Sequence, residues 1–310
     1  MSLKKTMPDR ACSVTGVREI ASPTDPQLGL AYVHLGMVSV EAGEDRAFNF
    51  GPLETVAVIL CGVAEVAWED EDGVERRETI GGRRDVFGGP PWAFFAHPFT
   101  TFEVKGLSPF VEMALVRAEQ PEPGPDCLYE CGCVEGGCET MEMRAGAEET
   151  VCGREFRLDC GVEIISPDEV VRRKLGERTV STIVGAKTSA GARRLIVGES
   201  MVCRGNWLAY PGHKHDEDVL GEETRLEEVC HFRFRPERGF GMGRVYSPKR
   251  RFDQSYTIEN GDTLAIPFGY HTFAVAPGYD AYCLWALGGE RRQLLLREDE
   301  RHAWVRHIGR

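Results

Sequence analysis

The sequence predicts an all-β fold made of two β-rich blocks in one chain. Most segments are short runs of β-branched or aromatic residues that end at Gly, Pro or Asp-Gly, and few have the periodicity of a helix. The chain also has 310 residues, which is more than a single hydrophobic core usually supports. We therefore expect two β domains, at residues 29–118 and 168–310.

The sequence also predicts the order of segments, strands and turns along the chain. Residues 1–28 are an N-terminal segment, and residues 119–167 are a linker or insertion. The clusters of β-branched and aromatic residues predict strands at 55–60, 63–68, 93–95, 101–104, 194–197 and 263–266. The Asp-Gly pair at 72–73 predicts a hairpin turn. Residues 167–174 are expected to form a helix that joins the two blocks, and 298–304 one closing turn.

Composition and charge limit the class of partner. Hydrophobic residues make up 42% and charged residues 28% of the chain, as in ordinary globular proteins. The net charge of −12 argues against nucleic acid or an anionic membrane as the main partner, because both require a basic surface. The N-terminus has no apolar run typical of a signal peptide, and no stretch approaches a membrane-spanning helix. We expect a cytoplasmic protein that acts on a small molecule.

Four residues in the second block have the pattern of a metal site. His213 and His215 stand at alternate positions, so in a strand both side chains lie on one face. Glu228 begins a second strand-like run, and His271 ends a Pro-x-Gly-x-His motif. A single histidine in such a place is usually a hydrogen-bonded core residue, but this combination and spacing favour ligation. Imidazoles with one carboxylate suit a divalent transition metal such as Mn, Fe, Ni or Zn.

The same motifs resemble those of the cupin superfamily, His-x-His…Glu and Gly-x5-Pro-x-Gly…His. Within it, the chain resembles the 5-deoxy-glucuronate isomerase (IolB) family of inositol catabolism, which is related to the 4-deoxy-uronate ketol-isomerases. The segments that carry the resemblance are Tyr-Pro-Gly-His-Lys-His-Asp at 210–216, Gly-Phe-Gly-Met-Gly-Arg-Val-Tyr at 239–246, Pro-Phe-Gly-Tyr-His at 267–271 and Ala-Pro-Gly-Tyr-Asp at 276–280. The resemblance implies a bicupin, two double-stranded β-helix jelly-roll barrels in one chain, with the metal in the C-terminal barrel.

The first block carries only a partial version of these motifs. Residues 82–98 imitate the second cupin motif, but no His-x-His precedes them. His34 and His97 are isolated, and we interpret both as structural or surface residues. The first barrel is therefore expected to bind no metal and to act as a packing or dimerisation partner, which agrees with the degenerate first cupin of the family. We also expect the protein to form a homo-oligomer.

Between the blocks lies a cysteine-rich stretch. Cys127, Cys131, Cys133, Cys138, Cys152 and Cys160 all fall within it. Zinc is disfavoured because no Cys-x2-Cys pair occurs, and disulfides because the cytosol is reducing. We favour a hairpin extension whose cysteines act as small reduced hydrophobes and are dispensable for catalysis.

A metal held by four protein ligands leaves positions for two substrate oxygens, which suits aldose–ketose isomerisation of a sugar acid. Arg244, in the Arg-Val-Tyr motif that resembles the family's, is the candidate for the substrate carboxylate. The candidates for base catalysis are Asp216 and Glu227, although strand alternation predicts that Glu227 faces outward. Further substrate contacts are expected from the side chains of Tyr246, Tyr270, Tyr279, Tyr282 and Cys230.

The chain departs from the family at Gly212, Cys230 and Gly243, so the resemblance carries over to the fold and the metal but not to the exact substrate. Two other functions are compatible with the motifs. A cupin Fe(II) dioxygenase also uses three histidines and a glutamate, and it would consume dioxygen. A sugar-binding bicupin without catalysis would bind its ligand without turnover.

Overall fold

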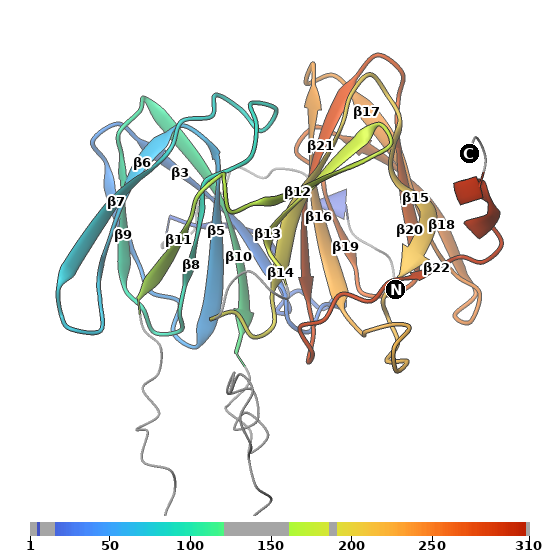
Figure 1. Cartoon of the computed structure of the whole chain (residues 1–310), viewed down its shortest axis with the longest axis horizontal. Helices are drawn as coiled ribbons and strands as arrows, with labels where there is room; N and C mark the ends of the chain where they lie inside the picture. The colour runs from blue at the N-terminus through green and yellow to red at the C-terminus, as the bar shows by residue number, and fades with distance from the viewer. Residues whose placement is uncertain (1–4, 7–15, 121–160, 186–190, 308–310) are drawn as a thin grey trace, which may run out of the picture.

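The computed structural model describes residues 5–6, 16–120, 161–185 and 191–307. These residues form strands β1 to β22 and one short 3-10 helix, Ala303–His307, and contain no α-helix. Figure 1 shows two β-barrels side by side, with the N-terminal half of the chain in one and the C-terminal half in the other. Among the described residues, no helix has the length and apolar character needed to span a membrane.

The first barrel consists of a six-stranded sheet and a four-stranded sheet. The six-stranded sheet has the order β11 (Val162–Ile165), β8 (Ala93–Ala96), β5 (Leu53–Cys61), β10 (Phe110–Glu119), β3 (His34–Glu41), β2 (Arg18–Ala21). The four-stranded sheet has the order β4 (Asp45–Phe48), β9 (Phe102–Gly106), β6 (Val63–Glu69), β7 (Glu75–Gly81). Their pairings are antiparallel throughout.

The second barrel repeats this plan with larger sheets. The seven-stranded sheet has the order β1 (Lys5–Thr6), β19 (Thr263–Ile266), β16 (Glu227–Arg235), β21 (Asp280–Gly288), β14 (Ile196–Val202), β13 (Arg178–Val184), β12 (Val171–Leu175). The five-stranded sheet has the order β18 (Phe252–Glu259), β17 (Phe240–Ser247), β20 (Tyr270–Val275), β15 (Trp207–Lys214), β22 (Arg297–Glu298).

The buried apolar residues form three cores. One fills the first barrel, one fills the second, and the third lies between the six-stranded and seven-stranded sheets. Strand β5 contributes to two of them, because Ala57 and Ile59 face into the first barrel while Val56 and Val58 face the second. A strand buried on both faces needs a continuous apolar run, which explains the sequence of residues 55–60.

The expected helix at 167–174 is wrong. Its second half is β12, an edge strand whose backbone pairs with β13, and whose side chains from Val171 to Leu175 are all exposed. The charged Arg-Arg-Lys run therefore covers a solvent-facing sheet edge, where charges prevent pairing with another chain. The proposed domain boundaries also omit two strands of the first sheet, because β2 and β11 lie outside 29–118 and yet pair with β3 and β8.

Candidate metal centre

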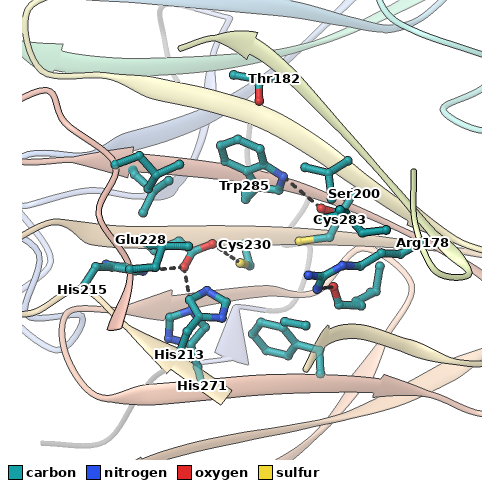
Figure 2. A pocket seen from close by; sticks show the side chains of 18 of the residues that line it. Arg178, Thr182, Ser200, His213, His215, Glu228, Cys230, His271, Cys283 and Trp285 are labelled. Atoms are coloured by element: carbon teal, nitrogen blue, oxygen red, sulfur yellow. Dashed lines mark hydrogen bonds and ion pairs between the residues drawn. The ribbon is translucent and has the colours of Figure 1, made fainter. Parts of the chain in front are cut away.

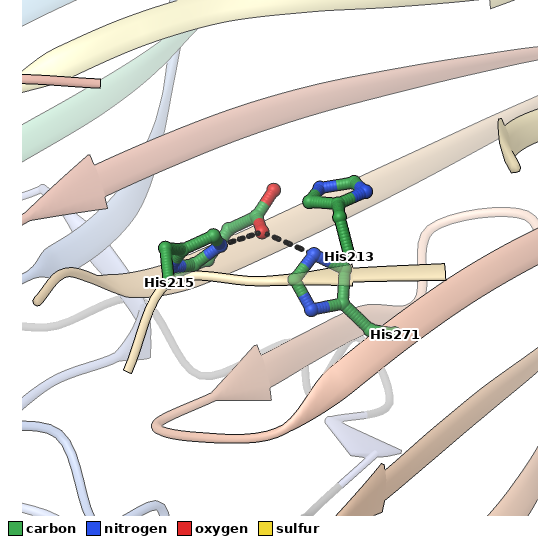
Figure 3. Close-up of side chains that lie close together, drawn as sticks. His213, His215 and His271 are labelled. Carbon is green, nitrogen blue, oxygen red and sulfur yellow. Dashed lines mark hydrogen bonds and ion pairs between the residues drawn. The ribbon is translucent and has the colours of Figure 1, made fainter. Parts of the chain in front are cut away.

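The structure brings the four predicted ligands together inside the second barrel. His213 lies on β15, His215 directly after it, Glu228 on β16 and His271 on β20. One potential ligand atom from each residue lies within 4.8 Å of all the others. Figure 3 shows the three imidazoles gathered around the carboxylate. Since β16 belongs to the seven-stranded sheet and β15 and β20 to the five-stranded sheet, the cluster bridges the two sheets across the barrel interior.

Strand register explains this convergence. His213 and His271 are directly opposite in the β15–β20 pair, so their side chains point to the same face. Their ring centroids are 4.4 Å apart, and those of His215 and His271 are 5.1 Å apart. The pairing of β15 with β20 therefore brings the three imidazoles to one place inside the barrel.

Hydrogen bonds fix two imidazoles in the tautomer that suits a metal. Nδ1 of His215 lies 2.9 Å from the Leu226 carbonyl oxygen, and Nδ1 of His271 lies 3.1 Å from that of Gly269. A carbonyl can only accept, so each Nδ1 carries the hydrogen and each Nε2 of a neutral ring presents a lone pair. Such a bond on the remote nitrogen is the usual support of a metal-bound histidine.

Both Nε2 atoms face one carboxylate oxygen. They lie 3.1 Å (His215) and 3.0 Å (His271) from Oε2 of Glu228, and among the described residues Nε2 of His271 is buried without a hydrogen-bond partner. Three electron-rich atoms at these separations repel one another unless a proton or a cation lies between them. Two ligands ~2.1 Å from one ion and at right angles are about 3 Å apart. The residues therefore fit a divalent transition metal.

Electrostatics favour the ionised carboxylate. Burial by itself raises the pKa of Glu228, but the electrostatic influence of the neighbouring His271 and His215 side chains outweighs it and holds that pKa well below its usual range. Burial lowers the pKa of His213 well below its usual value, and the neighbouring positive charges, including Arg178, lower it further. A neutral His213 and an ionised Glu228 are the forms that ligate metals.

The cluster borders a cavity of about 300 Å³ (Figure 2). Most of its wall is apolar and includes the side chains of Leu208, Phe273 and Trp285. The polar groups of the lining, apart from the cluster, are Arg173, Arg178, Thr182, Ser200, Cys230 and Cys283. A mainly apolar cavity with a few polar groups is typical of a site for a small molecule.

Two lining groups are tied to neighbours inside the cavity. The Cys230 thiol donates to Oε1 of Glu228 at 3.2 Å, and burial, with Cys283 and Glu228 beside it, raises the pKa of this thiol well above its usual value. Trp285 donates through Nε1 to the Ser200 hydroxyl at 3.1 Å. Of the six residues predicted to contact substrate, only Cys230 lines this cavity.

Asp216, a predicted base, positions the centre from outside the cavity. Its carboxylate accepts from the Lys214 ammonium at 2.7 Å and from the backbone N–H of Gly269 at 2.9 Å. Gly269 supplies the carbonyl that holds His271, so Asp216 secures the turn that precedes this ligand. The geometry gives Asp216 a positioning role rather than contact with a substrate.

Glu227, the other predicted base, points away from the site. Its carboxylate accepts three backbone N–H groups of the first barrel, those of Ala31, Tyr32 and Val33, each at 2.7 Å. Burial raises the pKa of Glu227, while these hydrogen bonds oppose the shift. Because strand residues alternate, Glu227 faces the first barrel while Glu228 faces the cavity. Glu227 therefore holds the barrels together, and its assignment as a base is corrected.

Arg244 also lies on the wrong face for its predicted role. In the β17–β20 pair Val245 is opposite His271 and shares the barrel interior, so the adjacent residues Arg244, Tyr246 and Tyr270 face outward. Arg244 makes a two-point ion pair with Asp253, at 2.8 and 2.6 Å. These three side chains do not line the cavity.

The remaining tyrosines are structural in this geometry. Tyr282 is fully buried in the core between the barrels, where its ring lies 5.9 Å from the Arg83 guanidinium. Tyr279 packs beside Phe240, with ring centroids 6.3 Å apart. Neither belongs to the cavity lining.

Two of the three family departures also lie outside the cavity lining. A Cβ atom at Gly212 would lie 2.9 Å from the Tyr246 hydroxyl, and one at Gly243 would lie 2.9 Å from Ile258 and 3.0 Å from Phe273. Both glycines therefore make room for neighbouring side chains. Only Cys230 changes the chemistry of the cavity itself.

The first barrel has a different residue at the position that corresponds to Glu228 of the second barrel. Glu54 and Glu227 are equivalent, because each accepts three backbone N–H groups from the other barrel. The next residue is Glu228 in the second barrel but Thr55 in the first. The absence of metal from the first barrel stays a prediction, and this substitution of a hydroxyl for a carboxylate supports it.

The two histidines of the first barrel have protein partners. Nε2 of His97 lies 3.0 Å from Oε1 of Glu163, and Nδ1 of His34 lies 3.2 Å from Oγ of Ser22. The cysteine-rich stretch from Cys127 to Cys160 lies outside the described residues, so the reduced and dispensable state expected for it also stays a prediction.

Comparisons with known proteins agree with this geometry. The KduI/IolB family model matches residues 7–132 and 124–305. The 5-deoxy-glucuronate isomerase of Shouchella clausii is 40% identical over 277 residues, which cover 89% of this chain and 88% of the relative. That of Halalkalibacterium halodurans is 33% identical and covers 98% and 99% of the two chains.

Solved structures give the same result for the fold. An IolB-like protein from Salmonella typhimurium superimposes with a TM-score of 0.75 and 27% sequence identity over 98% of both chains. An oxalate decarboxylase from Lactobacillus farciminis has a TM-score of 0.61 at 12% identity, covering 94% of this chain and 85% of that one, and shares the fold alone. The predicted bicupin architecture is confirmed.

Proposed function

The chain belongs to the KduI/IolB family, and we propose that it is a metal-dependent isomerase of a deoxy-uronate, with 5-deoxy-glucuronate as the leading substrate. The observation that carries this proposal is the cluster of three histidines and Glu228 at the wall of a cavity of about 300 Å³. We further propose a role in inositol catabolism and a cytoplasmic, homo-oligomeric enzyme.

His213, His215, Glu228 and His271 would hold the metal, which supplies Lewis acidity to a carbonyl oxygen and its neighbouring hydroxyl. The net reaction moves one hydrogen from C2 to C1 and one from the C2 hydroxyl to the C1 oxygen, so the aldehyde becomes a ketone without any external oxidant. This balance requires neither dioxygen nor a redox cofactor.

The protein's own groups bind and shield the substrate. Leu208, Phe273 and Trp285 give the cavity an apolar wall, which would strengthen the electrostatic contacts of a bound substrate. The hydroxyls of Thr182 and Ser200 lie in the same lining and suit the hydroxyls of a sugar.

A direct assay tests the proposal. Metal-replete protein should convert 5-deoxy-glucuronate to the ketose, as followed by NMR. A chelator should abolish conversion, because the carbonyl then loses its Lewis acid, and Mn, Zn, Fe or Ni should restore it. A first-barrel variant, His97→Ala, should keep wild-type activity.

Two outcomes would replace the isomerase by another function. Iron-dependent dioxygen uptake without carbonyl migration would favour the dioxygenase. Tight binding of deoxy-uronates without turnover by metal-replete protein would favour a sugar-binding bicupin.

A further inference from the structure

We propose that Arg178 binds the carboxylate of the sugar acid and so selects charged over neutral sugars. This inference rests on the proposed isomerase function, and it gives to Arg178 the role that the sequence suggested for Arg244. In Figure 2, Arg178 lies on one side of the cavity, and His215 and Glu228 lie on the other. A substrate whose carbonyl end lies at the metal ligands would then extend its remote end toward Arg178.

The position of Arg178 follows from strand alternation. Arg178, Val180 and Thr182 are alternate residues of β13, and all three line the cavity. The first of them lies at the beginning of the strand. The other two contribute one apolar side chain and one hydroxyl group to the lining.

The guanidinium of Arg178 is anchored to the opposite sheet. Its Nη1 donates to the backbone carbonyl oxygen of Leu208 at 2.7 Å, and Leu208 lies on β15, the strand that also carries His213. A guanidinium has five N–H donors in a rigid fork, so one can anchor it while others contact a carboxylate. The anchor reduces the rotamer entropy that is lost when an anion binds.

The charges around the cavity favour an anion at this place. Within the described lining the only carboxylate is that of Glu228, which the three histidines surround. The chain as a whole has a net charge of −12, so a positive group inside an apolar cavity is a local exception. A carboxylate at Arg178 would lie across the cavity from Glu228, and the positive charge of the guanidinium would attract it (Figure 2).

Arg173 is the competing residue, because it also lines the cavity. It lies on the edge strand β12, where its side chain is exposed, whereas Arg178 is half-buried. Exposed ion pairs contribute little free energy because water screens them. Arg244 is unsuitable because Asp253 already neutralises it outside the barrel.

The contact should affect binding more than turnover. The carboxylate is remote from the reacting carbons and keeps its charge throughout the reaction, so Arg178 should stabilise the ground state and the transition state alike. Loss of such a contact raises KM and leaves kcat nearly unchanged.

The test compares Arg178→Met, Arg178→Lys, Arg173→Met and Arg244→Met in metal-loaded protein. With 5-deoxy-glucuronate, Arg178→Met should raise KM roughly 10- to 100-fold. Arg178→Lys, which keeps the charge without the fork, should give a smaller increase. With the neutral 5-deoxy-glucose, Arg178→Met should have the same kcat/KM as the wild type, which a merely structural defect would not produce. Arg244→Met should behave as the wild type with both sugars.

Metal content and melting temperature of each variant establish that it is folded. If Arg178→Met does not fold, Arg178→Lys carries the comparison, and its KM increase must again be confined to the charged sugar. An unchanged KM in a folded Arg178 variant, equal losses with both sugars, or a charged-sugar effect confined to Arg173→Met would overturn the inference.

The carboxylate contact of Arg178 can be tested separately from the proposed isomerase activity. If the wild type converts no deoxy-uronate, isomerase activity fails, and calorimetry with glucuronate as the probe then tests Arg178 by itself. Weakening of glucuronate binding by roughly tenfold or more in Arg178→Met supports the carboxylate contact. Equal binding in the wild type and the variant, or no binding to either, refutes it.

Discussion

Replacement of His215 or His271 by alanine should remove the bound metal ion and lower kcat/KM by roughly a thousandfold or more. Each histidine would supply one of the four proposed ligand atoms, and a backbone carbonyl holds each in the tautomer that suits a metal. Loss of the ion removes several kcal/mol of transition-state stabilisation, and each ~1.4 kcal/mol corresponds to a factor of ten. Elemental analysis of purified protein, together with the isomerase assay, measures both effects.

His34→Ala is the matched control, because His34 lies in the first barrel with Ser22 as its partner. This variant should keep both the ion and the activity. Stoichiometric metal in both His215→Ala and His271→Ala would contradict the assignment of the centre, and loss of an ion from His34→Ala would contradict the prediction of a metal-free first barrel.

Glu227→Gln should destabilise the fold by about 3 kcal/mol without removing the metal. Glu227 joins the second barrel to three N–H groups of the first, and Glu54 joins the first barrel to the N–H groups of Arg193, Arg194 and Leu195 in the second. A neutral amide accepts these hydrogen bonds less strongly, and its NH₂ group faces other donors. Urea unfolding should show the loss for Glu227→Gln and also for Glu54→Gln.

The same variant decides between the two roles considered for Glu227. The loss of a general base typically lowers kcat by about 10²- to 10⁴-fold, whereas a link between barrels changes stability and leaves kcat of the folded protein nearly intact. Glu222→Gln is the control, because the side chain of Glu222 is 63% exposed and should change neither property. A large fall in kcat with unchanged stability would restore Glu227 as the base.

The sequence predicted the convergence of His213, His215, Glu228 and His271, because the placement of these residues depends on local rules. Alternation alone puts His213 and His215 on one face, and the Pro-x-Gly-x-His turn presents His271 at the start of a strand. The two-barrel architecture likewise follows from β-rich blocks of sufficient length and from the motifs. The register of β15 against β20 then places His213 opposite His271, as the spacing of the motifs suggested.

The substrate side of the site could not be predicted in the same way. Alternation separates the residues of β17 into two faces, but it does not tell which face is the interior, and Val245 rather than Arg244 proved to be inside. Arg178 was missed because it follows a segment interpreted as a helix, so its strand and its face were not considered. The run of mostly β-branched residues at 179–184, Thr-Val-Ser-Thr-Ile-Val, was the available signal for a strand.

A metal titration of chelator-treated protein is the most direct test of the central claim, that one ion held by His213, His215, Glu228 and His271 supports isomerisation of a sugar acid. We predict that activity on 5-deoxy-glucuronate rises in proportion to added metal and reaches its plateau at one ion per chain. Activity that is independent of metal, or that requires a second ion before it appears, would contradict the account.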